Sequence, residues 1–374
     1  MVVKHNFYKL ARTHKLQNTL YCGGLDFHLF NGYDANMAIY GPAEHYYGKE
    51  MYETVYNVYA TAVSILHFEN PADAPKFAKI ITLLELYAKK IIDTLVIKCN
   101  VRVFKPQAAF YEQFGPVGLI LLSRICGYIK EMEKIHDLLI NLLDCKRGDI
   151  STTQEAYFRA LLGDLNDPLG INYTPYGFDI INVTPWMGKD VLALCDEKAG
   201  KDLLGLKLMR QGKGIIVVNK SSNPSGPEYQ ELVLKDGEIT LQMKNVHDLY
   251  AINQEFDLEY DGLSTIGMVV GSTHECDGSI RKAFPSTTLL VPGFGAQGGK
   301  FNKIMKELIP TGPHAGLGAI FSSSRGTMYA FLTENGGSGR VENLEADLIA
   351  SIASFRKAEK QAYADANIPY PFEG

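Results

Sequence analysis

Short apolar runs rich in Val, Ile and Leu recur along the chain, and polar residues or Gly and Pro end each of them. Most are followed by a segment with the apolar spacing of a helix, a pattern typical of parallel sheets. The predicted strands are 19–25, 94–104, 138–143, 178–183, 214–218, 265–271, 287–291 and 316–321. The predicted helices are 50–68, 75–93, 116–135, 153–163, 188–200, 243–260, 299–308 and 344–366.

Eight strand–helix repeats favour an α/β fold of the (β/α)8 TIM-barrel type. An open doubly wound sheet usually has five or six strands, so two of the eight predicted strands would have no place in it. Segments 231–234 and 238–242, joined by Lys235-Asp236-Gly237, predict a β-hairpin inserted after the fifth strand, within 226–242. We therefore expect residues 1–374 to form a single barrel domain, closed by a C-terminal helix and tail over 344–374.

The composition and charge of the chain bear on two questions: which kinds of partner it could bind and in which cellular compartment it would work. The chain has 37 Lys and Arg against 42 Asp and Glu, and no basic run is longer than a dipeptide, which argues against a nucleic-acid partner. The apolar run 116–123 stops at Arg124, too short for a membrane helix, and the N-terminal residues do not resemble a signal peptide. The six cysteines form no C-x-x-C pair, so we expect reduced thiols, no zinc site and a cytoplasmic location.

Polar side chains follow several predicted strands, and barrel enzymes place their chemistry at these carboxyl ends. Asp144 and Lys146 lie two positions apart at the third strand, with Asp149 in the turn and Lys105 ending the second strand. Each carboxylate would keep a neighbouring ammonium charged, so the four residues would form an alternating array. Such an array suits stabilisation of a carbanion and delivery of a proton. A buried ion-pair network that only fixes strand register would need the same residues.

Two consecutive strand ends have residues suited to a phosphate group. The Gly-rich segment 292–299 follows the seventh predicted strand, and Arg325-Gly326 follows the eighth. Glycine lets backbone N–H groups approach phosphate oxygens, and a guanidinium binds them in a bidentate manner. Barrel enzymes commonly bind phosphate here, although a flexible loop with an exposed arginine would have the same composition.

Ser222 and Asn223, after the fifth strand, offer hydroxyl and amide groups that could bind the edge of an amide-containing ring. Turn composition alone explains this segment equally well. The nine histidines lack the spacing of metal ligands, so no residue is assigned to a metal.

Six segments between residue 22 and about residue 330, which follow one another in the family's order, resemble the orotidine 5′-monophosphate decarboxylase family, in particular its longer bacterial-type branch. The most specific are Asp144-Cys145-Lys146-Arg147-Gly148-Asp149-Ile150 and Pro292-Gly293-Phe294-Gly295-Ala296-Gln297-Gly298-Gly299. The others are 22–26, 104–112, 222–225 and 323–326.

The resemblance implies decarboxylation of orotidine 5′-monophosphate to uridine 5′-monophosphate, the last step of de novo pyrimidine synthesis, with no cofactor, by a homodimer with shared active sites. The implied catalytic residues are Lys105, Asp144, Lys146 and Asp149, with Asp144 facing the substrate carboxylate and Lys146 protonating C6. Asp149, with Thr153 beside it, would reach into the partner's site. The implied substrate-binding residues are Asp26 for ribose, Ser222 and Asn223 for the pyrimidine, Gln297, Gly298, Arg325 and Gly326 for phosphate, and Thr153.

This sequence departs from the family pattern in the segment 27–47, which lacks the proline that usually follows the first Asp closely, and at Ser221, where a threonine is common. Two other readings remain open. A metal-dependent enzyme acting on a sugar phosphate would need further carboxylates at strand ends, and the sequence offers no convincing set. A catalytically inactive nucleotide-binding barrel would not need the intact charge array.

Overall fold

A closed barrel of eight parallel strands forms the centre of the protein, in the order β1-β12-β11-β10-β7-β4-β3-β2. This computed structural model describes residues 5–28, 43–163, 173–196, 200–235, 239–273, 276–294 and 300–372. The barrel strands are β1 (Tyr21–Gly24), β2 (Val103–Lys105), β3 (Ile140–Arg147), β4 (Ile180–Val183), β7 (Gly214–Lys220), β10 (Ile266–Val270), β11 (Leu289–Pro292) and β12 (Ala319–Ser323). The predicted (β/α)8 barrel is confirmed.

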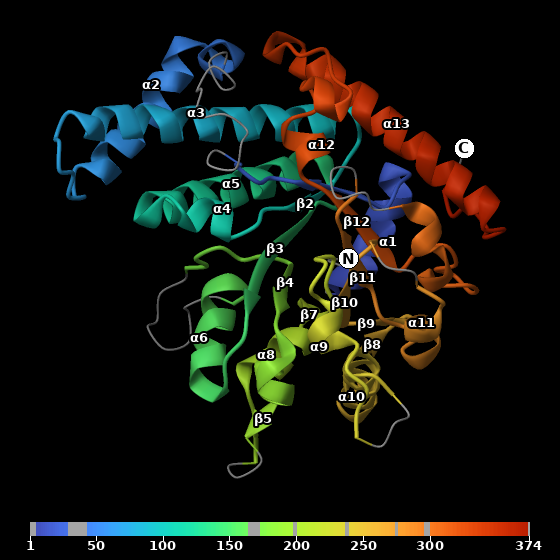
Figure 1. Cartoon of the computed structure of the whole chain (residues 1–374). Helices are drawn as coiled ribbons and strands as arrows, with labels where there is room; N and C mark the ends of the chain where they lie inside the picture. The colour runs from blue at the N-terminus through green and yellow to red at the C-terminus, as the bar shows by residue number, and fades with distance from the viewer. Residues whose placement is uncertain are drawn as a thin grey trace.

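Helices surround this barrel, as Figure 1 shows. The α-helices are α1 (Asn6–Gln17), α2 (Ala43–Val63), α3 (Asp73–Asp93), α4 (Ala109–Glu112), α5 (Gly115–His136), α6 (Ser151–Leu161), α8 (Leu204–Arg210), α9 (Pro227–Gln230), α10 (Leu241–Glu255), α11 (Ser279–Ala283), α12 (Arg325–Met328) and α13 (Leu344–Asp365). Two small antiparallel sheets pair β5 (Cys195–Asp196) with β6 (Lys201–Asp202) and β8 (Glu259–Tyr260) with β9 (Leu263–Ser264).

Helix α1, which the apolar pattern did not predict, covers the amino end of the barrel. Its Phe7 ring packs so closely on Gly214 and Gly267, at the start of β7 and β10, that a Cβ there would lie about 3.0 Å from the ring. Glycine at these two positions therefore makes room for the helix. This contact joins residues far apart in the sequence, so local periodicity gives no sign of it.

Three predicted elements are wrong. The predicted strand 94–104 begins as a π-helical turn, η2 (Thr94–Lys98), because the chain continues from α3 without a break and buries Leu95 and Val96. The predicted helix 188–200 is the 3-10 segment η3 (Pro185–Leu192) followed by β5, since Gly188 has a φ of +67°. The predicted helix 299–308 consists of two 3-10 turns, η4 (Phe301–Lys303) and η5 (Met305–Glu307).

The predicted hairpin insertion contains a helical turn and a single bridge. Helix α9 opens the segment, and Val233 then pairs with Thr240 in an isolated antiparallel bridge. Asp236 and Gly237 of the predicted turn, and Glu238 after it, lie outside the described residues.

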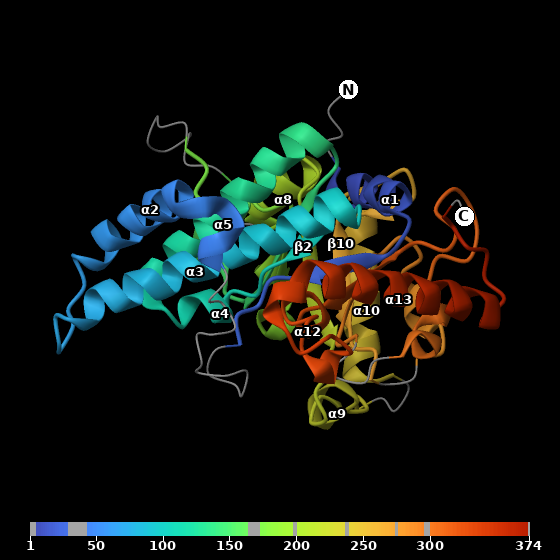
Figure 2. The same cartoon turned by 90° about the horizontal axis from the view of Figure 1, so that it is seen from above.

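Helices α2 and α3 form a long antiparallel pair that projects beyond the ring of helices in both views (Figures 1 and 2). The fully buried Glu85 of α3 ties the pair to α5. Its carboxylate accepts hydrogen bonds from Tyr59 Oη and Arg124 Nε, each at 2.6 Å, and lies 2.7 Å from Lys89 Nζ. Burial raises the pKa of Glu85, but these partners, Arg124 above all, outweigh it and lower that pKa.

All six cysteines are free thiols, and five of them are buried. Among the described residues, no helix is long and apolar enough to cross a membrane.

The long helix α13 packs along the side of the barrel and holds the start of β1 through Glu359. This buried carboxyl accepts hydrogen bonds from Thr19 Oγ1 at 2.7 Å and from the Leu20 backbone N–H at 2.9 Å. Burial raises the pKa of Glu359 from 4.5 to about 7, because these two donors and Arg356 compensate only in part.

We expect Glu359→Gln to remove a pH dependence of stability. The folded state keeps the Glu359 proton up to about pH 7, whereas the unfolded chain loses it near pH 4.5. Stability of the wild-type protein should therefore fall as the pH rises through this window, by about 2–3 kcal/mol. Urea unfolding of both proteins at the two ends of the window measures the difference. Parallel pH profiles would show that Glu359 titrates normally in the folded state.

Candidate active site

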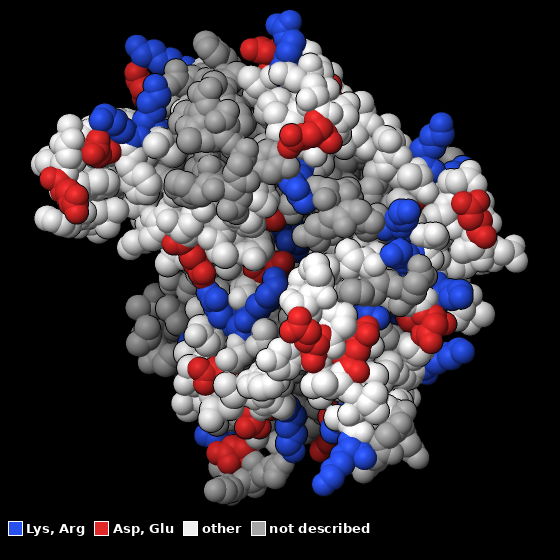
Figure 3. Space-filling view, in the orientation of Figure 1, with Lys and Arg blue, Asp and Glu red and all other residues white. Residues whose placement is uncertain are grey.

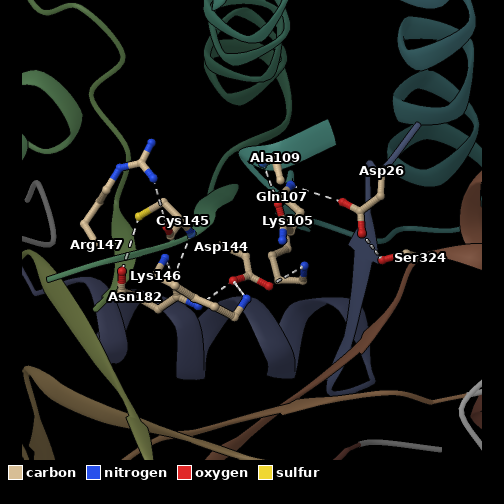
Figure 4. Close-up of polar contacts among 10 residues, drawn as sticks. All are labelled: Asp26, Lys105, Gln107, Ala109, Asp144, Cys145, Lys146, Arg147, Asn182 and Ser324. Atoms are coloured by element: carbon tan, nitrogen blue, oxygen red, sulfur yellow. Dashed lines mark hydrogen bonds and ion pairs between the residues drawn. The ribbon is translucent and has the colours of Figure 1, made fainter. Parts of the chain in front are cut away.

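Three charged side chains meet at the carboxyl ends of β2 and β3 (Figure 4). Lys105 Nζ lies 3.3 Å from one carboxylate oxygen of Asp144, and Lys146 Nζ forms an ion pair with the other. Lys105 is the last residue of β2, and the parallel pairing of β2 with β3 brings it beside Asp144. The structure thus places one carboxylate between two ammonium groups.

Burial and charge act in opposite directions on these groups. Lys105 is 3% exposed and Asp144 8% exposed. Burial alone would lower the pKa of Lys105, but the carboxylates of Asp26 and Asp144 outweigh it and raise that pKa. Burial would raise the pKa of Asp144, yet Lys105 and Lys146 hold it well below its usual range. Lys105 and Asp144 are therefore both charged at neutral pH.

Asn182 of β4 fixes the backbone at Lys146. Its Oδ1 accepts hydrogen bonds from the backbone N–H groups of Cys145 and Lys146, and its Nδ2 donates to Asp144, all at 2.7 Å. Lys146 has a φ of +47°, a left-handed conformation that costs a residue with a side chain about 1–2 kcal/mol. The register of β3 with β4 shifts at the same place. Asn182 thus holds the strained turn that directs Lys146 onto Asp144.

Asp26 lies beside this array, just after β1. Its carboxylate accepts hydrogen bonds from the Gln107 backbone N–H at 3.1 Å and from the Ser324 hydroxyl. A Cβ on Gly24 would lie 2.2 Å from Ser324 Oγ, so only glycine lets the chain after β12 approach β1 this closely. The glycines before Asp26 therefore allow the carboxylate to contact both neighbouring strand ends.

A cavity of about 440 Å³ opens at this end of the barrel and contains seven of the predicted residues. They are Asp26, Lys105, Asp144, Lys146, Ser222, Asn223 and Arg325. Figure 3 shows basic and acidic side chains together in a hollow near the centre of this face. The cavity thus combines the charge array with amide and hydroxyl groups and a guanidinium.

Five predicted residues are not among those lining the cavity. Gln297 and Gly298 lie outside the described residues. Gly326 is the second residue of α12 and follows Arg325. Asp149 and Thr153 lie at the start of α6, where the Asp149 backbone N–H donates to Gln154 Oε1 at 3.0 Å. Within the described chain, no ion pair joins Asp149 to Lys146.

Thirteen of the twenty described residues that line the cavity were not predicted as site residues, among them His28, Phe110 and Asn182. The His28 ring lies 4.3 Å from that of Phe110, and its backbone N–H donates to Tyr329 Oη at 2.8 Å. Asn182 could have been found from the sequence, since it is the one polar residue in the buried strand Ile180–Val183. For His28 and Phe110, the sequence carries no comparable signal.

The described residues contain no group of three or more His, Cys, Asp or Glu side chains placed to hold a metal ion. What the site does contain is the fixed positive charge of the buried Lys105, with a second lysine, Lys146, paired to the same carboxylate. In such a setting a charge stabilises a developing anion far more than it would in water. Fold and site therefore define a (β/α)8-barrel enzyme suited to stabilising a carbanion and protonating it.

Comparison with known proteins identifies the family. The model of the orotidine 5′-phosphate decarboxylase / HUMPS family matches residues 87–330, and the chain belongs to this family. Orotidine 5′-phosphate decarboxylase from Rhodopirellula baltica is 35% identical over 235 residues, which cover 62% of this chain and 68% of the relative. The enzyme from Caldicellulosiruptor saccharolyticus is 33% identical over 254 residues, covering 67% and 74%.

Solved structures agree on the fold. The crystal structure of orotidine 5′-monophosphate decarboxylase from Plasmodium berghei gives a TM-score of 0.65 at 17% identity, covering 97% of this chain and 100% of that one. That of a putative orotidine 5′-phosphate decarboxylase from Streptomyces avermitilis gives 0.60 at 23% identity, covering 96% and 98%. Helix α2 and the first part of α3 lie before the residues that the family model matches.

Proposed function

We propose that this protein is a carboxy-lyase that converts orotidine 5′-monophosphate to uridine 5′-monophosphate, the last step of de novo pyrimidine synthesis. Family membership and the curated relatives at 33% and 35% identity support this reaction. The observation that carries the proposal is the ion-paired array of Lys105, Asp144 and Lys146 in the cavity, in which Lys105 and Asp144 are buried.

The chemistry requires what this array supplies. Breaking the bond between C6 and the carboxylate releases CO₂ and leaves the electron pair on C6, where the pyrimidine ring delocalises it poorly. The ammonium of Lys146 stabilises this carbanion and then gives a proton to C6, so that product leaves with a C6–H bond. Asp144 directs Lys146 through their ion pair, and Lys105 balances the charge of Asp144 from the other side.

The remaining cavity residues bind the parts of the substrate that do not react. Asp26 binds ribose hydroxyls, and Lys105 lies between the ribose and the array. Ser222 and Asn223 bind the pyrimidine amide. Arg325, with Gln297 and the neighbouring glycines 298 and 326, binds the phosphate. Binding energy gained at the phosphate, away from C6, favours the transition state when it closes the site around the reacting ring.

Arg325→Ala is expected to raise KM for orotidine 5′-monophosphate strongly and to lower kcat/KM, because a charged hydrogen bond to phosphate contributes about 1.5–3 kcal/mol. Orotidine, which lacks the phosphate, should be turned over equally by the wild-type and variant enzymes. Steady-state kinetics with the two substrates measure both effects. If the variant lost as much kcat/KM with orotidine as with orotidine 5′-monophosphate, Arg325 would not be a residue that binds the phosphate.

We also propose a homodimer in which each active site is shared. The Lys146 side chain is 47% exposed and pairs with Asp144, whereas Asp149 and Thr153 lie at the start of α6, away from the cavity of their own chain. A two-fold axis near this edge of the barrel mouth would bring the second chain's copies of both residues to Lys146. The resemblance of the Asp144–Ile150 segment to the family motif supports the same arrangement.

A cytoplasmic location is proposed on the cysteines, because six free thiols are typical of proteins in a reducing compartment. Neither a metal-dependent reaction on a sugar phosphate nor an inactive nucleotide-binding barrel is favoured by any feature of the site.

A further inference from the structure

A second and larger cavity, of about 1050 Å³, lies outside the barrel, between η3, β7, α9 and α10. Val218 of β7 lines both this groove and the catalytic cavity, so the two are neighbours across one strand. The groove's inner wall is apolar and buried, with Val191, Leu192, Val217 and Leu249 each less than 5% exposed. None of the residues that we assign to the reaction lines it.

Two buried polar atoms in this groove have no hydrogen-bond partner in the described structure: Asn219 Nδ2, a donor, and Gln242 Oε1, an acceptor. Asn219 is only 3% exposed, and its Oδ1 accepts a hydrogen bond from Asn245 Nδ2 at 2.9 Å. That bond fixes which end of the amide is the oxygen and leaves Nδ2 without an acceptor among the described residues. A buried donor or acceptor without a partner destabilises a protein by about 1–3 kcal/mol. Such atoms therefore indicate that a ligand supplies the missing hydrogen bonds.

Aromatic side chains stand at the rim of the groove on two different elements. Trp186 of η3, the only tryptophan of the chain, is 75% exposed, and Tyr229 of α9 is 61% exposed. Exposed aromatic rings beside an apolar hollow are typical of a site where a flat ring stacks. The charged Lys244 at the edge is already paired with Asp248. The groove therefore offers stacking surface, one donor and one acceptor, and its described cations do not form a cluster for phosphate.

We propose that this groove is a second ligand site, for a flat ring with a C=O and an N–H group side by side, the lactam edge of a uracil-type base or nucleoside. The ring would stack at Trp186, its carbonyl oxygen would accept from Asn219 Nδ2, and its N–H would donate to Gln242 Oε1. The two unsatisfied atoms then gain partners and the apolar wall is covered. This site does not depend on the reaction proposed for the barrel.

Trp186 reports directly on occupancy, because it is the only source of tryptophan fluorescence. Titration of the full-length protein with uridine should give a saturable change in that fluorescence. The ligand 3-methyluridine, whose ring nitrogen cannot donate, should bind about tenfold more weakly, as expected for a lost hydrogen bond to a buried atom. Asp26→Ala and Asn223→Ala, which remove the proposed ribose and pyrimidine contacts of the catalytic cavity, should leave the uridine titration unchanged, which separates this site from the catalytic cavity.

Variants of the two polar residues complete the test. Gln242→Met keeps the length of the side chain without its acceptor and should weaken uridine binding about tenfold, as should Asn219→Leu. Gln254→Met, an exposed position on the same helix that does not line the groove, is the matched control and should bind as the wild type does. Circular dichroism and thermal melting establish that each variant is folded.

Three results would overturn the proposal: no saturable response to uridine, equal affinity for uridine and 3-methyluridine, or an unchanged affinity in a folded Gln242→Met protein. A Trp186 signal that changes on dilution of the protein but not with uridine would also overturn it, by assigning the groove to contact between two copies of the chain.

Discussion

Lys146→Ala is expected to abolish turnover of orotidine 5′-monophosphate while leaving part of the affinity for a substrate analogue. Loss of a positioned proton donor costs about 10²–10⁴-fold in rate. The same change removes the positive charge nearest to the carbanion, and removal of one such electrostatic contact costs about 10²–10³-fold more. Binding of the ribose and phosphate relies on other residues, so uridine 5′-monophosphate should still bind. Single-turnover kinetics and calorimetric titration measure the two quantities separately.

Lys220→Ala is a matched control for this variant. Lys220 also ends a barrel strand, β7, but it pairs with Glu231 at 3.4 Å and does not line the catalytic cavity. It should keep activity near that of the wild type. A Lys146→Ala enzyme that turns over within about tenfold of the wild type would contradict the role given to Lys146 as proton donor.

Mixing two inactive variants should restore activity if the active site is shared between chains. In a two-fold dimer of Lys146→Ala with Asp149→Ala, one site carries both lesions and the other carries none. When chains exchange at random, half of the dimers are mixed, and each has one intact site of two. About a quarter of the wild-type activity should therefore return.

Subunit exchange must be measured in the same sample, by native mass spectrometry of differently tagged chains. Homodimers of either variant alone, treated identically, give the background. Full exchange with no recovery of activity would place Lys146 and Asp149 in the site of the same chain. That result would leave the chemistry of Lys146 intact and remove the shared-site architecture.

Local sequence patterns were sufficient to predict the barrel fold and to identify most residues of the charge array. Each barrel strand is a short apolar run with a polar end, and parallel pairing brings these ends to one side of the molecule, so Lys105 and Asp144 could be placed together before their distance was known. Cavity-lining positions such as Ser222 and Arg325 followed from the same rule.

Contacts between segments far apart in the sequence could not be predicted from such local patterns. The spacing of Asp144 and Lys146 suggests that both share one face of a regular strand, yet Lys146 has a positive φ and is held by Asn182 from β4. Helix α1 depends on the space left by Gly214 and Gly267, which no local periodicity reports. Asp149 does not line the cavity of its own chain, and the role proposed for it needs the second chain of the proposed homodimer.

The central claim, decarboxylation without a metal ion, is tested most directly by following the absorbance of orotidine 5′-monophosphate with purified protein, with and without EDTA. The account predicts consumption of the substrate with formation of uridine 5′-monophosphate at the same rate in both conditions. Loss of activity in EDTA that is restored by a divalent metal would instead favour a metal-dependent barrel enzyme, and no consumption in either condition by a folded protein would favour an inactive nucleotide-binding barrel.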